Sequence, residues 1–382
     1  MKKIGHSTLF LTTSKNNPRN GESTFARLSD GKILLAYTQY ISEDWEDHAA
    51  ARLCSCVSSD EGETWSEPTV RIEKETSAQN IMSPSLFRMT NGQLGIVYLR
   101  KDLTPDGYIT CMPIFSASDD EGQTWSRPVY CTTESGFYCA INDGCTVDRS
   151  GRIWVPLSYH GIGYDTVGRT GFPIAKYKSS VLRFAYSDDN GRTWDTLPAV
   201  IESPFEDTVG FAEPGIYEHE NGRLWVYCRS AYGFQYQSFS EDRGKTWTPP
   251  TPNFHFTSPD SPMRVKRTGN MTVAVFNPKP FTCVRTDTEV WNSPKRTPLV
   301  CAVSFDDGHS FDSTGKTFSN GHLLDFTSNC YLLEEDETNS YCYPAVIGVK
   351  DGFLVSYYHS NGTPICLNSS RVVKVYWDEI QP

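Results

Sequence analysis

The chain has 382 residues, of which 38% are hydrophobic and 21% charged, and its formal net charge is -11 at pH 7. The apolar fraction supports a large folded core and excludes global disorder. The acidic balance argues against sequence-nonspecific nucleic-acid binding, which needs a basic surface. No stretch approaches about 18 consecutive apolar residues, so no membrane-spanning helix is predicted.

The N-terminal segment contains Lys2 and Lys3 but no sustained apolar run. We therefore expect no signal peptide and a cytoplasmic location, or secretion if the sequence is a mature form. The 12 cysteines show no CxxC spacing. We expect reduced, mostly buried thiols and no zinc site or cofactor.

Two turn motifs alternate along the chain. The first is a glycine turn that leads into an apolar strand, and an x-Gly turn between apolar runs is typical of a hairpin. Its six copies begin at Asp30-Gly31, Asn91-Gly92, Ser150-Gly151, Asn221-Gly222, Thr268-Gly269 and Asp351-Gly352. The copy at Thr268 has the weakest pattern.

The second motif is an octapeptide with the pattern S-x-D-x-G-x-T-W. It begins at Ser58, Ser118, Ser187, Ser240 and, in a weaker form, Ser304. Its Asp and Gly favour a tight turn, with positive φ at the glycine and the Trp packed beneath. A repeat of roughly 60 residues with several strands predicts radial sheets. The fold expected is all-β, a six-bladed β-propeller that forms one domain over residues 1–382.

Counting eight residues back from each glycine turn gives a polar residue in every copy. These residues are Glu22, Ser83, Asn142, Glu213, Asp260 and Tyr343. Counting eight forward gives the facing ends of the next strands, at Thr38, Leu99, Ser158, Arg229, Phe276 and His359. Innermost strands converge on a propeller axis, so these ends could form one cleft. The alternative is that the polar residues mark solvated strand ends.

The octapeptides resemble the Asp-boxes of the sialidase (neuraminidase) superfamily, whose members are six-bladed propellers. That resemblance implies a structural role for the boxes, on turns away from the active site. A more specific likeness lies in Glu213, which precedes Arg229 by 16 residues with a glycine turn between them. Tyr343, shortly before the last glycine turn, resembles the catalytic tyrosine of the family. Arg296, ahead of the last octapeptide, resembles a further arginine of the family.

The same resemblance places an acid/base aspartate before the first octapeptide, where Asp47 fits best and Asp44 second. One feature departs from the family: the chain has no Arg-Ile-Pro motif, and Arg19 lies two residues too early. Either a small bulge returns Arg19 to the site, or Glu22 adds a carboxylate and modifies the anion pocket. Further substrate contacts are expected among Asn142, Asp143, His160, Asp260, Arg264 and Tyr357.

The resemblance implies an exo-glycosidase that releases a terminal acidic sugar, sialic acid or a related nonulosonic acid, with retention. Tyr343 would be the nucleophile, Glu213 its base and Asp47 the acid/base. Arginines would bind the sugar carboxylate, and no metal is required. One alternative is a propeller that acts on another acidic sugar, as a uronic-acid glycosidase or a polysaccharide lyase. Another is a noncatalytic glycan-binding propeller. The partner expected is a glycan or small acidic sugar, with no nucleic acid or membrane.

Overall fold

The computed structural model describes residues 1–165, 173–174, 179–205, 210–279, 296–311, 330–360 and 367–380. The described chain is all-β, and its one helical element is a short 3-10 turn, η1 (Trp377–Glu379). None of the described helical residues forms a helix long and apolar enough to cross a membrane. No disulfide joins any two of the ten cysteines in these ranges, and eight of the ten are buried.

Four sheets of four strands are separate from one another. The first contains β2 (Asn20–Arg27), β3 (Ile33–Tyr40), β4 (Ala51–Ser58) and β5 (Thr69–Ile72). The next two contain β17 (Ala212–Glu218), β18 (Leu224–Arg229), β19 (Phe234–Ser240) and β20 (Thr251–Thr257), then β21 (Arg264–Thr268), β22 (Met271–Phe276), β23 (Leu299–Ser304) and β24 (Cys330–Glu334). The last contains β25 (Tyr341–Val349), β26 (Gly352–His359), β27 (Ser369–Tyr376) and β1 (His6–Leu11), so the first strand of the chain completes the last sheet.

The second and third hairpin units share one sheet of eleven strands. The second unit supplies β6 (Asn80–Arg88), β7 (Leu94–Leu103), β8 (Tyr108–Ser118) and β9 (Val129–Tyr130). The other seven strands of this sheet are β10 (Phe137–Cys139), β11 (Thr146–Val147), β12 (Ile153–Gly161), β13 (Gly163–Asp165), β14 (Pro173–Ile174), β15 (Val181–Ser187) and β16 (Asp195–Thr196). The two units are joined because β10 pairs with β12 and also, in parallel, with β8.

The six glycine turns connect antiparallel strands, as the sequence predicts. The pairs are β2–β3, β6–β7, β11–β12, β17–β18, β21–β22 and β25–β26. The weak copy at Thr268 is a hairpin too, with Thr268 opposite Met271. Gly31, Gly92 and Gly222 have φ between 85° and 89°, a region that favours glycine.

The octapeptide turns repeat one hydrogen-bond pattern. In the first copy the Ser58 hydroxyl donates to Asp60 Oδ1 at 2.8 Å and accepts from the Gly62 amide at 2.8 Å. Asp60 also accepts from the amide and the hydroxyl of Thr64, at 2.9 and 2.5 Å. The other four copies show equivalent bonds, with Ser310 replacing the threonine in the last.

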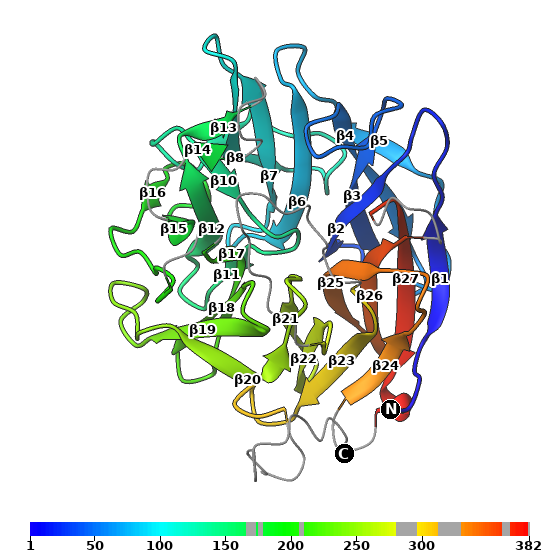
Figure 1. Cartoon of the computed structure of the whole chain (residues 1–382). Coiled ribbons are helices and arrows are strands. Elements are labelled where there is room, and N and C mark those ends of the chain that lie inside the picture. Colours follow the sequence, from blue (N-terminus) through cyan, green and yellow to red (C-terminus); the bar gives the residue numbers. More distant parts are fainter. Residues whose placement is uncertain are drawn as a thin grey trace.

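The sheets are arranged around a common centre, and the first strand of each hairpin unit is nearest to it (Figure 1). Contacts run from β2 to β6, from β6 to β11, from β12 to β17, then through β21 and β25 back to β2. Apolar clusters fill the space between neighbouring sheets; one, for example, joins Leu34 and Leu53 of the first sheet to Ile96 and Ile114 of the second unit. The core therefore lies between sheets, and strand ends at the centre carry polar side chains.

Candidate active site

A residue with left-handed backbone geometry stands at or just before the start of each innermost strand. The φ values lie between 48° and 57° at Glu22, Ser83, Asp143, Glu213, Asp260 and Tyr343. In four units the strand register shifts at this residue, which is the mark of a β-bulge. A bulge redirects a side chain away from its normal place on the sheet. The same left-handed backbone geometry therefore places a polar side chain at this position in each unit.

The count of eight residues gives this position correctly in five units and is one residue off in the third. There the left-handed residue is Asp143, not Asn142. The inner strand of that unit, β11, pairs over only two residues, and Asp143 lies three residues before it. Asn142 is buried beside it, and its side-chain amide donates to the carbonyls of Ser23 at 2.6 Å and Tyr343 at 3.2 Å.

Tyr343 and Glu213 form a direct hydrogen-bonded pair. The Tyr343 hydroxyl donates to Glu213 Oε1 at 2.5 Å. Arg229 Nη1 donates to the other oxygen of the same carboxylate at 3.0 Å. The three residues come from β25, β17 and β18, and Glu213 and Arg229 are only 11% and 12% exposed. A hydroxyl, a carboxylate and a guanidinium are thus aligned in one chain of hydrogen bonds.

Asp260 joins two arginines on the other side of this chain. Its carboxylate accepts from Arg229 Nε at 2.6 Å and from Arg229 Nη2 at 3.1 Å. Its main-chain carbonyl accepts from Arg296 Nη2 at 3.0 Å. The guanidinium carbon of Arg296 lies 5.7 Å from the centre of the Tyr343 ring. Both arginines therefore lie beside the tyrosine.

Arg19 lies in the same network, together with Glu22. Arg19 Nη1 donates to Asp47 Oδ1 at 2.5 Å, and Arg19 Nη2 donates to Glu22 Oε1 at 2.9 Å. Its Nε donates at 2.9 Å to the hydroxyl of Tyr358, whose ring packs edge-on against Tyr343. The register shift after Gly21 accompanies this arrangement. The structure thus contains both a bulge in β2 and a carboxylate at Glu22 that bonds Arg19.

The nine predicted residues form two hydrogen-bonded groups, one around Arg19 and one around Arg229, and the packed rings of Tyr358 and Tyr343 join the two groups into one network. Four carboxylates, those of Glu22, Asp47, Glu213 and Asp260, share it with Arg19, Arg229 and Arg296. The fourth cation is Lys101, whose ammonium donates to the main-chain carbonyl of Asp47 at 2.5 Å. An incoming anion would therefore compete with resident carboxylates for the guanidinium groups.

Burial and neighbouring charges shift several pKa values in this network. Burial, and then the adjacent Glu213 carboxylate, raise the pKa of Tyr343 well above its usual value. Burial also raises the pKa of Glu22, although Arg19 opposes the shift. For Asp47, loss of hydration acts to raise the pKa, but the charges of Arg19 and Lys101 outweigh it and lower the pKa. Asp47 is thus an ionised carboxylate, and its side chain is 63% exposed.

Other residues considered from the sequence lie elsewhere or play a supporting part. The Tyr357 hydroxyl donates to Glu334 within the apolar cluster of the last two sheets. Arg264 is buried against Asp143, with 3.2 Å between its Nε and the carboxylate. His160 is hydrogen-bonded to the Ser158 hydroxyl, which accepts from the Glu213 amide at 3.3 Å. Asp44 is exposed and its carboxylate accepts from the amide of Glu46.

Sequence reasoning missed Lys101 and Tyr358. Lys101 lies at the end of β7, directly opposite Asn80, and Tyr358 lies in β26 next to the strand of Tyr343. Tyr358 is one residue from the position reached by counting forward to His359, so the count could have indicated it. Lys101 had no such signal, because its role depends on contact with the loop of another unit.

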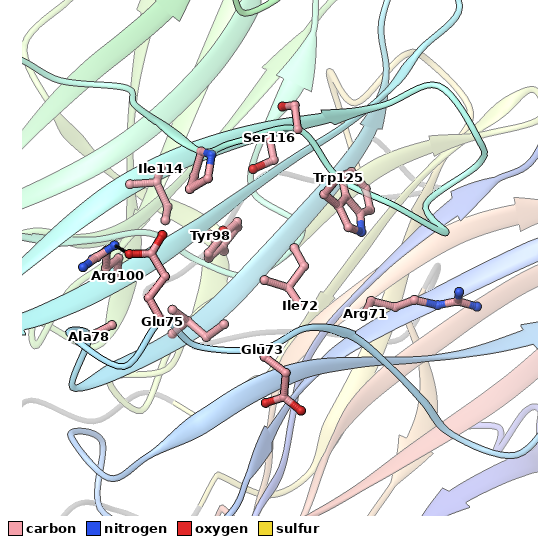
Figure 2. A pocket seen from close by; sticks show the side chains of 13 residues that line it. Arg71, Ile72, Glu73, Glu75, Ala78, Tyr98, Arg100, Ile114, Ser116 and Trp125 are labelled. Atoms are coloured by element: carbon pink, nitrogen blue, oxygen red, sulfur yellow. Dashed lines mark hydrogen bonds and ion pairs between the residues drawn. The ribbon is translucent and has the colours of Figure 1, made fainter.

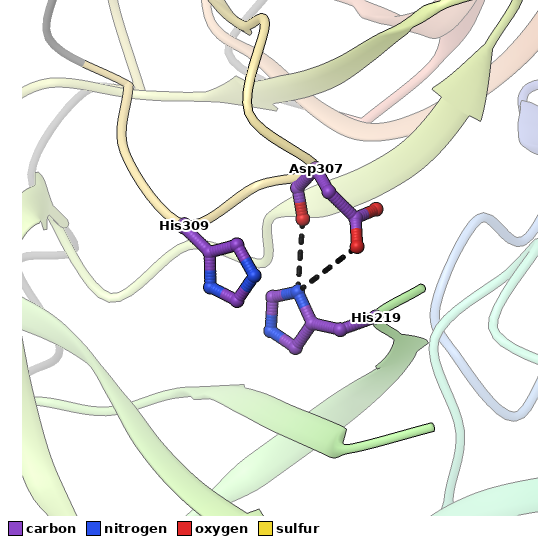
Figure 3. Close-up of side chains that lie close together, drawn as sticks. All are labelled: His219, Asp307 and His309. Carbon is purple, nitrogen blue, oxygen red and sulfur yellow. Dashed lines mark hydrogen bonds and ion pairs between the residues drawn. The ribbon is translucent and has the colours of Figure 1, made fainter. Parts of the chain in front are cut away.

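One other cluster has side chains of the kinds that bind metals. His219, which follows β17, lies together with Asp307 and His309, which follow β23 (Figure 3). The two imidazole rings are stacked, with centroids 4.4 Å apart and planes at 6°. A ligand nitrogen bonds a metal in its own ring plane, so stacked parallel rings do not share one ion. The Asp307 carboxylate accepts from Tyr217 at 2.7 Å and also bonds Arg267. The cluster therefore does not fit a metal centre.

A hollow of about 220 Å³ lies between the first sheet and the second hairpin unit (Figure 2). Its wall comes from β5, β6, β7, β8 and adjoining loops, and includes the ion pair between Arg100 and Glu75 at 2.7 Å. None of the nine predicted residues lines it.

Comparison with known proteins agrees with this architecture. A family model described as a BNR repeat-like domain matches residues 46–356. No curated protein shows significant sequence similarity. A protein of unknown function from Dyadobacter fermentans has 17% identity and a TM-score of 0.70, with 97% of this chain and 98% of that chain covered.

Two further structures are similar to most of this chain. The intramolecular trans-sialidase from Ruminococcus gnavus has 14% identity and a TM-score of 0.64, with 99% of each chain covered. The NanB sialidase from Streptococcus pneumoniae has 11% identity and a TM-score of 0.69, with 99% of this chain and 71% of that chain covered. At these identities the likeness is one of fold. The family match spans most of the sequence, and the chain therefore belongs to the BNR repeat-like family.

Proposed function

We propose that the chain is a single six-bladed propeller and an exo-glycosidase that releases a terminal acidic sugar with retention of configuration. Sialic acid is the leading candidate. Six hairpin units and a series of inner-strand contacts that returns to its start support the propeller. The hydrogen bond of 2.5 Å between the Tyr343 hydroxyl and Glu213 carries the proposal for the chemistry.

Tyr343 attacks the anomeric carbon of the sugar while Glu213 accepts the phenolic proton. The bond to the leaving oxygen breaks, and a covalent glycosyl-tyrosine forms. A water molecule then attacks the same carbon, Glu213 returns the proton to the tyrosine, and two inversions give net retention. A neutral hydroxyl suits a sugar with a carboxylate on the reacting carbon, because an ionised carboxylate nucleophile would be repelled.

Asp47 protonates the leaving oxygen in the first step and activates water in the second. It is ionised while it pairs with Arg19. The sugar carboxylate replaces Asp47 on Arg19, since Asp47 is the exposed partner and Glu22 is buried. That exchange removes a cation from Asp47 and places an anion nearby, so the pKa of Asp47 rises toward the range a general acid needs. Arg229 and Arg296 also bind the carboxylate of the sugar.

The test is release of an aryl leaving group from a panel of acidic sugars, with product identification. We expect release from the aryl sialoside and a loss of about 1000-fold or more in Tyr343→Phe. Tyr341→Phe is the matched control, because Tyr341 lies in the same strand but is buried in the apolar core. It should keep full activity.

Each alternative has its own outcome in the same panel. An unsaturated, ultraviolet-absorbing product from a uronic-acid polymer would identify a lyase and refute retention through a glycosyl-tyrosine. Sugar binding without turnover, unaffected by Glu213→Gln, would identify a noncatalytic glycan-binding protein.

A further inference from the structure

The loop between β3 and β4, which carries Asp47, is attached to the neighbouring unit through three consecutive carbonyl groups. The carbonyl of Asp47 accepts from Lys101 Nζ at 2.5 Å. The carbonyl of His48 accepts from the Gln79 side chain at 3.2 Å, and that of Ala49 accepts from the Asn80 side chain. All three donors lie close together, because Asn80 is opposite Lys101 and the main-chain amide of Gln79 donates to the main-chain carbonyl of Lys101.

Lys101 is the unusual member of this trio. It is charged but only 4% exposed, and a buried ammonium costs several kcal/mol unless it is well partnered. Lys374, the other lysine of comparable burial, pairs with the carboxylates of Glu63 and Asp351. Within the described ranges Lys101 makes no such ion pair, and its hydrogen bond goes to the Asp47 carbonyl. Its hydrogen bond therefore holds the loop, while its charge helps to lower the pKa of Asp47.

The Lys101 bond reaches the main chain of Asp47 itself, whereas Arg19 reaches the main chain of this loop at the Trp45 carbonyl, to which its Nη1 donates at 3.3 Å. Asp47 contacts Arg19 through its carboxylate. Its side chain is 63% exposed, and its carboxylate meets Arg19 from the solvent side. When a sugar takes over Arg19, the side-chain anchor is lost. The Lys101 bond to the carbonyl is independent of the carboxylate and persists through that exchange.

We propose that Lys101 is the positioning residue of Asp47, holding its loop so that the carboxylate stays at the leaving oxygen after it leaves Arg19. This inference rests on the proposed function. It assigns to the second unit a part in the acid step, although that unit contributes no residue to the Tyr343 and Glu213 pair.

The leaving group distinguishes a positioning role from a general loss of structure. A nitrophenolate leaves without much help from an acid, whereas the alcohol of a natural glycan requires protonation. We expect Lys101→Met to lower kcat/KM about 100-fold on a sialylated glycan and less than about 5-fold on the nitrophenyl sialoside. Lys101→Arg, which keeps a donor and a charge, should recover part of the loss on the glycan.

Lys374→Met is the matched control, as a buried lysine on a strand outside the site. It should lower the melting temperature without any dependence on the leaving group. Equal losses on both substrates in Lys101→Met, with Tyr343→Phe inactive, would overturn the inference and leave the proposed function intact.

Amide hydrogen exchange tests the attachment without reference to activity. In Lys101→Met we expect exchange over residues 41–50 to accelerate at least about 10-fold, and no change there in Lys374→Met. Gln79→Ala is a milder second variant, since Gln79 is exposed, and should give a smaller acceleration confined to the same loop. Unchanged exchange in the Lys101 and Gln79 variants would overturn the inference. A wild-type protein inactive on both sialosides would refute the proposed function, while the exchange result still decides the attachment.

Discussion

Replacing Glu213 with glutamine removes the base from the Tyr343 hydroxyl and preserves the size of the side chain. A phenol with a pKa near 10 is ionised in only about one molecule in a thousand at pH 7. Burial and the Glu213 carboxylate raise the pKa of Tyr343 further, so the free phenolate is rarer still in the wild type. Without a base at 2.5 Å, attack depends on preformed phenolate. We therefore expect kcat/KM of Glu213→Gln to fall by about 1000-fold at pH 7, or about 4 kcal/mol in activation free energy.

The same argument predicts the pH dependence of what remains. Removing the carboxylate leaves the charges of Arg229 and Arg296 beside the phenol, and both favour phenolate. The residual kcat/KM should rise about tenfold per pH unit on the alkaline side until the phenolate forms, whereas the wild type should show no such rise. Initial rates on the aryl sialoside between about pH 6 and pH 10 measure both slopes.

Glu22→Gln is the matched control for this experiment. Glu22 is a buried carboxylate of the same network, but it bonds Arg19 and the Ser83 hydroxyl rather than Tyr343. Its replacement should raise KM and leave the pH slope of kcat/KM unchanged. If Glu213→Gln retained more than a tenth of wild-type activity at pH 7, or its profile were flat, the assignment of Glu213 as the base would be refuted.

Two predictions concern stability. Asp143→Ala should cost about 3–5 kcal/mol in the free energy of unfolding and lower the melting temperature, because it leaves Arg264 and Lys266 without the carboxylate that each meets at 3.2 Å; a melting temperature within a degree of wild type would contradict this. Acid should also destabilise the octapeptide turns. Hydrogen bonds from the threonine side chain and amide lower the pKa of Asp120 and Asp242 from 3.8 to about 2. Stability from these bonds is complete above about pH 4 and is lost as pH falls toward 2. Between about pH 4 and pH 2 the melting temperature should therefore fall less in the double variant Asp120→Asn/Asp242→Asn than in the wild type.

The parts of the fold that follow from short-range pattern are predictable from the sequence. The glycine turns and the octapeptides are local, and each is decided by the backbone preference of one or two residues. The spacing of Glu213 and Arg229 is also local, since both belong to the hairpin β17–β18 and Ala212 lies opposite Arg229. Their mutual hydrogen bond follows from that register.

The contacts between hairpin units could not be predicted from the sequence pattern. The left-handed residue of the third unit is Asp143 rather than Asn142, and it precedes a two-residue inner strand whose shortness no sequence periodicity indicates. The parallel pairing of Phe137 with Cys111, which joins the second and third units, depends on how one unit packs on the next. Lys101 is another such case, because a lysine at the end of an apolar strand looks solvated until the neighbouring loop is placed over it.

The left-handed residues explain why the geometry of the site depends on how the sheets pack around the centre. A non-glycine residue in this region costs on the order of 1–3 kcal/mol and persists only where its surroundings fix it. Here the preceding unit supplies the anchor: the Ser83 amide donates to the Thr38 hydroxyl at 3.1 Å, and the Glu213 amide donates to the Ser158 hydroxyl at 3.3 Å. In the last unit the Tyr343 carbonyl is held from across the centre by Asn142. A unit alone could relax its bulge and turn its polar side chain away, so the geometry of Tyr343 and Glu213 depends on contacts that only the neighbouring and opposite units provide.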